Sequence, residues 1–113
     1  MTVRQATQEE AVAIHQPVEG YETWVAILED EGEPVGHLCL SRSMGQVFGH
    51  DTEVKSDDAH AALRLWRFAR AKAREWGASH VAVHFDDETP DRIRQFWKDR
   101  GFVKVMEVHR GEI

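Results

Sequence analysis

The sequence predicts an α/β domain in which a mixed, mostly antiparallel sheet is flanked by helices. Two apolar segments, 21–29 and 35–41, are separated by the turn residues of 31–34 and predict a β-hairpin. A long amphipathic helix is predicted over 57–76, and a shorter helix follows between two strand-like segments. Strands that come first and then alternate with helices indicate a mixed sheet covered by helices. The expected order of elements is β-α-βββ-α-β-α-β.

The N-terminal elements are predicted to be short. Residues 3–6 favour a first strand, and Thr7 with Glu10 has the capping-box pattern that begins a helix. That helix can run only to about His15, because Pro17 cannot continue it. Little chain is therefore left for a helical region before the hairpin.

The central helix is the most regular feature of the sequence. A third strand is expected over 47–54, with Gly49 as a candidate bulge, and the helix 57–76 then ends at Gly77. Leu63 is the apolar exception on the polar side of this helix. The arc expected to face the core contains Ala61, Ala62, Leu65, Trp66, Phe68, Ala69, Ala73 and Trp76. The opposite arc contains Arg64, Arg67, Arg70, Arg74 and Glu75.

The last third predicts a strand, a helix and a strand. Residues 80–86 alternate between apolar and polar side chains, and Thr89 is the expected cap of a helix with Pro90 in its first turn. Gly101 ends that helix, and 103–109 form the last expected strand. The expected buried stripe of the helix contains Ile93, Phe96 and Trp97.

Composition narrows the classes of function. The 113 residues fit one domain, 1–113, and 20 acidic against 14 basic residues give a formal charge of −6, which argues against a general nucleic-acid binder. Cys39 is the only cysteine, so a disulfide within the chain is excluded and a reducing compartment fits. We see no signal peptide or membrane span, and we expect a soluble protein in the cytoplasm or in a particle assembled there.

Two motifs carry a family resemblance. The segment 96–102, FWKDRGF, resembles the F-Y-x-x-x-G-F pattern at the end of the last helix in the GNAT acetyltransferase family, and 73–77 is similar to the family's A-x-x-x-G. The resemblance covers the chain from about Thr23 onward and implies a GNAT-like fold, with a reduced N-terminal region. In many members a tyrosine that protonates the leaving thiolate aligns with Trp97, whose indole is not a usable acid.

The coenzyme's phosphate loop, R/Q-x-x-G-x-G/A in the family, is not retained. Counting back from Gly77 places Asp57 at the basic position, His60 at the first glycine and Ala62 at the last small residue. Glycines let backbone N–H groups approach phosphate oxygens. Asp57 and Asp58 would instead repel a phosphate, at a cost on the order of a kcal/mol each.

The resemblance therefore implies the fold without its usual chemistry. Our first hypothesis is a non-catalytic interaction or structural protein without a cofactor, similar to GNAT-like internal virion proteins of short-tailed phages, with protein partners in an assembly; a homo-oligomer is compatible with it. The alternative is a small acetyl-CoA-dependent N-acetyltransferase. In that case Glu53 and His50 are the candidate bases. The candidate coenzyme contacts are Val54, His60 and Ala62.

The arginine stripe is the candidate partner surface. Arg64, Arg67, Arg70 and Arg74 could dock an acidic partner, or a nucleic acid in a third hypothesis that predicts binding with a steep salt dependence. The simpler interpretation is that the arginine stripe is exposed to solvent and binds no partner.

Other polar patterns predict no further site. His80 and His84 are four residues apart on a strand, about 13 Å, which is too far for one ion unless residues such as His50 or Asp51 join them. We therefore predict no metal site with Asp86 or its neighbours. Cys39 shares a strand face with His37, but a buried structural cysteine is the favoured interpretation.

Overall fold

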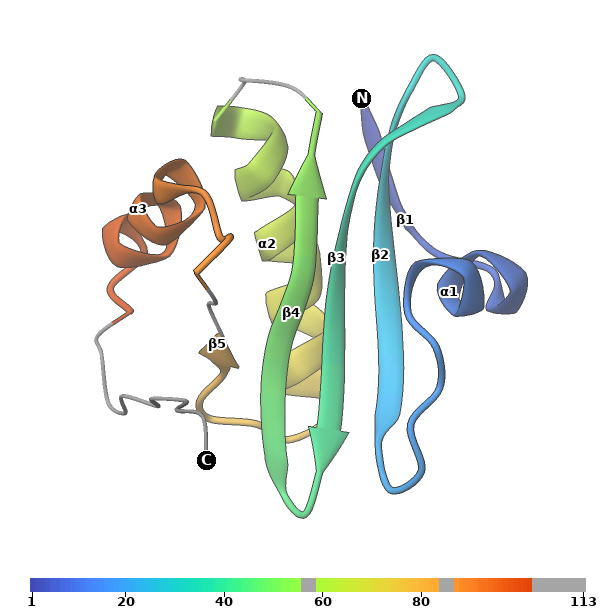
Figure 1. Cartoon of the computed structure of the whole chain (residues 1–113), viewed down its shortest axis with the longest axis vertical. Helices are drawn as coiled ribbons and strands as arrows, with labels where there is room; N and C mark the ends of the chain where they lie inside the picture. The colour runs from blue at the N-terminus through green and yellow to red at the C-terminus, as the bar shows by residue number, and fades with distance from the viewer. Residues whose placement is uncertain (56–58, 84–86, 103–113) are drawn as a thin grey trace, which may run out of the picture.

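The computed structural model describes residues 1–55, 59–83 and 87–102, which form one five-stranded sheet with helices on both of its faces (Figure 1). The strands lie in the order β1-β2-β3-β4-β5; the first three pairings are antiparallel and β4 pairs with β5 in parallel. The elements are β1 (Thr2–Gln5), α1 (Gln8–Ile14), β2 (Glu22–Asp30), β3 (Glu33–Ser43), β4 (Gln46–Val54), α2 (Ala59–Glu75), β5 (Ala82–Val83) and α3 (Asp91–Asp99). This confirms the predicted α/β class and mixed sheet.

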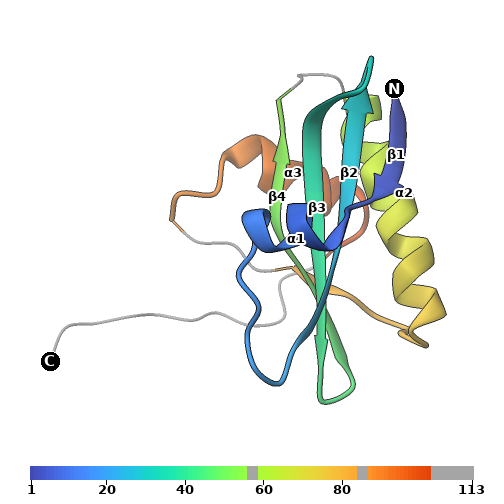
Figure 2. The ribbon, with the colours of Figure 1, turned by 90° about the vertical axis from the view of Figure 1, so that its right-hand side faces the viewer.

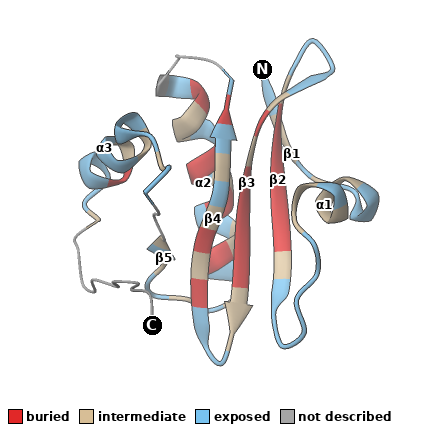
Figure 3. Cartoon of the chain, viewed as in Figure 1, coloured by how far each residue is buried: buried red, intermediate tan, exposed pale blue. Residues whose placement is uncertain are grey.

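Two tight turns set the register of the antiparallel strands. Glu31 and Gly32 join β2 to β3, and Met44 and Gly45 join β3 to β4, all four with positive φ. Two-residue turns of this backbone type match the twist of the strands that they join, and glycine adopts them without strain. Figure 3 shows that the central parts of β2 and β3 are buried, whereas their ends are half-buried or exposed.

Helix α2 covers the back face of the sheet, the face turned away from the viewer in Figure 1 and to the right in Figure 2. All core-facing residues expected on it are buried or half-buried, and the expected polar arc is exposed. The helix ends as predicted at Gly77, whose φ is 80°, and Ala78 N–H donates to the Ala73 carbonyl. The main apolar cluster contains Trp24, Ala26, Leu28, Leu38, Leu40, Val47, Val54, Ala61, Leu65, Trp66, Ala69, Ala73 and Trp97.

Helix α3 joins this core through aromatic rings. Trp97 is 2% exposed and packs edge-on against Trp66, with ring centroids 5.0 Å apart. Phe96 and Phe102 contact the Trp97 ring at 5.1 and 4.9 Å, so the predicted stripe is confirmed. The predicted cap residue is wrong, because Pro90 rather than Thr89 occupies the N-cap position, and Pro90 makes no side-chain capping hydrogen bond.

Helix α1 lies on the front face of the sheet, opposite α2 (Figure 2). Its capping box forms as predicted, since Glu10 N–H donates to Thr7 Oγ1 and Thr7 N–H donates to the Glu10 carboxylate. Arg4 then bridges Glu10 and Glu29, with both shortest contacts at 2.7 Å, and ties α1 to β1 and β2. Arg4 holds the pKa of Glu10 down at about 2, mainly by donating hydrogen bonds to it.

The structure differs from the sequence prediction at two strands, β4 and β5. The predicted bulge at Gly49 is wrong, because Gly49 pairs regularly with Leu40, and a Cβ there would approach Val83 Cγ1 at 3.1 Å. Of the predicted strand 80–86, only Ala82–Val83 is a strand within the described residues. The predicted strand 103–109, together with His84 and Asp86, lies outside the described residues.

Among the helices that the structure describes, none has the length and apolar character needed to cross a bilayer.

Candidate functional site

Strand β4 contains one residue more than the segment of β3 with which it pairs. The pairs Cys39–His50 and His37–Glu53 are two residues apart on β3 and three apart on β4. The extra residue forms a bulge in which Asp51 has a φ of 47°, in the left-handed region that aspartate adopts more readily than most residues. Neighbouring residues of a regular strand point to opposite faces. The bulge instead brings His50 Nδ1 within 3.0 Å of Asp51 Oδ2.

A chain of hydrogen bonds runs from this bulge across the front face. His50 Nε2 lies 2.8 Å from Ser41 Oγ, which lies 2.8 Å from Thr23 Oγ1. At the other end, His15 Nδ1 lies 2.8 Å from Asp51 Oδ2. Three strands and the end of α1 thus share one polar network. Burial favours the protonated form of Asp51, but the hydrogen bonds and charges of His50 and His15 outweigh it and lower its pKa.

An open groove of about 580 Å³ lies beside the bulge, between the end of α1 and the start of α3. On its floor, His37 pairs with Glu53 across β3 and β4, and burial lowers the pKa of His37 although Glu53 and Asp51 oppose the shift. The groove is lined by Ala13, Ile14, His37, Asp51, Thr52, Glu53, Val54, Pro90, Arg92 and Ile93.

The groove contains some, but not all, of the residues expected for acetyl transfer. Glu53 lines it with an exposed side chain, whereas both ring nitrogens of His50 are held by Ser41 and Asp51. Of the expected coenzyme contacts, Val54 lines the groove and belongs to the core. His60 and Ala62 do not line it.

Cys39 is a buried thiol on the front face of β3. It is 0% exposed, and burial raises its pKa to about 12. A thiol in this state is a poor nucleophile at neutral pH. The structural interpretation of Cys39 is therefore favoured over a Cys39–His37 pair.

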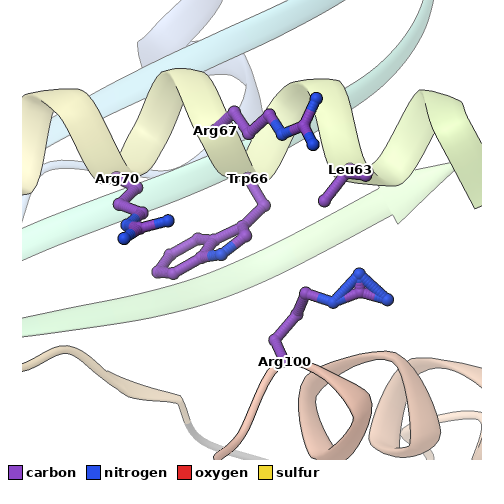
Figure 4. A pocket seen from close by; sticks show the side chains of 5 residues that line it. All are labelled: Leu63, Trp66, Arg67, Arg70 and Arg100. Atoms are coloured by element: carbon purple, nitrogen blue, oxygen red, sulfur yellow. The ribbon is translucent and has the colours of Figure 1, made fainter.

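A second hollow, of about 480 Å³, lies between α2 and the end of α3. We call it the arginine hollow and define it by Leu63, Trp66, Arg67, Arg70 and Arg100. Figure 4 shows four of these side chains projecting from α2 and Arg100 facing them from beyond α3, with the Trp66 indole between Arg70 and Arg100. Within the described part of the chain, the side chains of Arg67 and Arg70 make no hydrogen bond or ion pair, and Arg100 stacks over Phe96 at 5.1 Å.

The structure divides the predicted arginine stripe. Arg67 and Arg70 line the hollow, but Arg64 donates to the Met1 carbonyl at 2.8 Å and Arg74 lies outside the hollow. Sequence reasoning missed Arg100, which follows α3 and meets the stripe only through the packing of Trp97 on Trp66. It also missed His15 and Ser41, whose positions depend on the path of the chain across the front face.

Comparison with known proteins supports the fold. The class that the geometry defines is the GNAT-like α/β fold. An aminoglycoside 6'-N-acetyltransferase of Acinetobacter haemolyticus matches with a TM-score of 0.71 and 12% identity over 100% of this chain and 98% of that chain. An acetyltransferase of Trypanosoma brucei matches with a TM-score of 0.62 and 15% identity over 99% of both chains.

Several of the matching structures are named acetyltransferases or acyltransferases, and one carries a different functional name. A transcriptional regulator of Bacillus halodurans matches with a TM-score of 0.71 and 15% identity over 99% of both chains. No protein-family model matches this sequence, and no curated protein matches it significantly. At such identities the likeness concerns the fold, and function has to be argued from this chain's own residues.

Proposed function

We propose that this chain is a non-catalytic binding protein of GNAT-like fold, which contacts an acidic protein partner in an assembly through the arginine hollow. The observation that carries the proposal is that Arg67, Arg70 and Arg100 line one hollow with Trp66, and no carboxylate of the described residues is paired to Arg67 or Arg70. Arginine and tryptophan are the side chains most enriched at the energetic centres of protein interfaces.

The charge distribution supports a protein partner over a nucleic acid. The chain as a whole carries a formal charge of −6, so an extended polyanion would be repelled beyond this one patch. A single acidic side chain or short acidic segment needs only the local patch. Each guanidinium can hold a carboxylate through two parallel hydrogen bonds.

Two features argue against the usual acetyl transfer. Trp97, which the resemblance aligns with the family's tyrosine acid, is 2% exposed and enclosed by Trp66, Phe96 and Phe102. The segment 55–62 contains no glycine, and His60 is exposed in the first turn of α2. This start of the helix lacks the residues that let backbone amides surround a diphosphate.

Calorimetric titration with acetyl-CoA tests the non-catalytic part of the proposal. We expect no heat of binding at millimolar coenzyme. Micromolar affinity would contradict the proposal.

A charge-reversal pair tests the arginine hollow. We expect a short oligoglutamate peptide, used as the probe, to quench or shift the fluorescence of the wild-type chain at low salt. Arg70→Glu should abolish this response, and the matched control Arg74→Glu, on the same helix but outside the hollow, should retain it. If both variants lost the fluorescence response equally, the response would reflect the overall charge of the chain and would contradict a specific role for the hollow. Binding of duplex DNA with a steep salt dependence would favour the nucleic-acid hypothesis instead.

The second candidate function is N-acyl transfer from acetyl-CoA, which the groove beside β4 favours. Glu53 is exposed on its floor and is the residue that would accept a proton from an amine. An acetyl-CoA hydrolysis and transfer assay with a panel of amines decides this. Activity that is present in the wild type and lost in Glu53→Gln would establish the second candidate.

The resemblance to internal virion proteins suggests that the assembly is a phage particle, built in the host cytoplasm. Mass spectrometry of purified particles from an infected host tests this. Copies of the chain inside washed particles would support it, and recovery only from the lysate supernatant would contradict it.

A further inference from the structure

We propose that His15, His50 and Asp51 form a binding site for a divalent transition-metal ion, with zinc as the expected occupant. The sequence predicts no metal site, because His80 and His84 lie too far apart on one strand to share an ion. The bulge in β4 changes this, since it brings two consecutive residues together and points them at the end of α1. The site lies apart from the arginine hollow and does not depend on the proposed function.

The three ligand atoms are already close to coordinating distances. His15 Nδ1 and His50 Nδ1 lie 2.8 and 3.0 Å from Asp51 Oδ2, and one ligand atom from each residue falls within 4.8 Å of the others. Two ligands of a tetrahedral zinc with bonds of about 2.0–2.2 Å lie about 3.3–3.6 Å apart. Small side-chain rotations would therefore admit the ion.

The donor set suits zinc. Two imidazole nitrogens and one carboxylate oxygen form a borderline ligand set that zinc and its neighbours prefer to calcium or magnesium. Asp51 Oδ2 now faces two ring nitrogens at hydrogen-bonding distance. A cation among the three atoms would replace the protons that bridge them and would be bound by both imidazoles and the carboxylate.

A supporting hydrogen bond holds His50 in place. A histidine that binds a metal through one ring nitrogen usually donates its other ring N–H to a fixed acceptor. This hydrogen bond sets the tautomer and the orientation of the ring. Here His50 Nε2 lies 2.8 Å from Ser41 Oγ, and Ser41, 4% exposed, is itself held by Thr23. The histidine would thus present Nδ1 to the ion with its ring already oriented.

The site is open on one side. The side chains of His15, His50 and Asp51 are 27%, 19% and 50% exposed, so an ion can reach them from solvent. Three protein ligands leave the fourth tetrahedral position to water. The ion would also join the end of α1 to the bulge of β4, two elements far apart in the sequence.

Calorimetric titration of Zn²⁺ into the untagged, metal-free full-length chain tests the site. We expect one equivalent of ion in the wild type. The affinity should fall about tenfold or more in His15→Gln and in Asp51→Asn, whose amide still tolerates the left-handed backbone. The matched control His80→Gln removes an exposed histidine outside the cluster and should bind like the wild type.

A second measurement on the wild type keeps the test independent of any folding defect in the variants. Addition of Zn²⁺ should shift the Nδ1 resonances of His15 and His50 in nitrogen NMR spectra of the imidazole rings. Unchanged Nδ1 resonances, absence of binding, or equal affinity in all three variants would each overturn the proposal.

Discussion

The two faces of the sheet are built from different chemistry. The back face, under α2 and α3, is a continuous apolar cluster in which tryptophan rings contact one another. The front face also buries apolar side chains, such as Val25 and Ile27, but on β3 and β4 it carries the linked polar groups of Ser41, His50 and Asp51. Both faces belong to the same strands, because successive residues alternate between them.

This difference assigns separate roles to the two faces. Most of the buried apolar residues in the described part of the chain belong to the back-face cluster, so we expect apolar burial there to contribute most to stability. The front face can then contain a bulge, a left-handed aspartate and an open groove without loss of the fold. The following predictions test that division, from the largest expected effect to the smallest.

Leu65→Ala should cause the largest loss. Leu65 is 0% exposed in α2, and its truncation should cost about 2–5 kcal/mol of the free energy of unfolding. Ile27→Ala on the front face removes the same number of carbon atoms from a residue that is 3% exposed but lies outside the main cluster, so we expect a smaller loss. Urea denaturation measures both variants. A larger loss for Ile27→Ala would contradict the assignment.

Gly36→Ala tests how closely the faces are coupled through β3. A Cβ at Gly36 would lie 3.0 Å from the Glu53 carbonyl oxygen and 3.4 Å from Leu65 Cδ1, so backbone must shift, at about 1–3 kcal/mol. Gly49→Ala is the control, since its Cβ would meet a side chain, Val83, at 3.1 Å. We expect thermal denaturation to show a smaller decrease in Tm for Gly49→Ala than for Gly36→Ala.

The front face should respond to pH through His37. Burial lowers the pKa of folded His37 below its usual 6.5, so the unfolded chain takes up the proton first, and stability decreases as pH falls below about 6.5. His37→Gln should reduce this slope, and His80→Gln, at an exposed position, should not. Urea midpoints across this range, measured with a chelator present, report the difference. Identical slopes for wild type and His37→Gln would contradict it.

The smallest effect is expected at Glu10, whose side chain is 29% exposed. Its pKa falls from 4.5 to about 2 because Arg4 donates hydrogen bonds to it, so its contribution is full above pH 4.5 and is lost as pH falls toward 2. Glu10→Gln should destabilise the chain slightly at pH 6 and leave it unchanged near pH 2. Acid titrations followed by circular dichroism compare the two chains, and Glu9→Gln is the matched control.

The back face could be predicted from sequence because its signals are local. The spacing of Leu65, Trp66 and Ala69 within one helix specifies a buried arc, and Gly77 specifies where the helix ends. The bulge could not be placed, because the left-handed backbone at Asp51 is not specified by a residue pattern and Gly49 was the more obvious candidate. His15 gave no signal, since a histidine after a short helix contacts β4 only when the chain is folded.

The two-residue turns at Glu31–Gly32 and Met44–Gly45 have a consequence for the order of folding. They make β2, β3 and β4 a set of contacts between residues close in sequence, which cost little loop entropy to form. The parallel pairing of β4 with β5 must wait until the whole of α2 has crossed the sheet. We therefore expect the three-stranded meander to be formed in the transition state, and the β4–β5 junction to assemble last and open first.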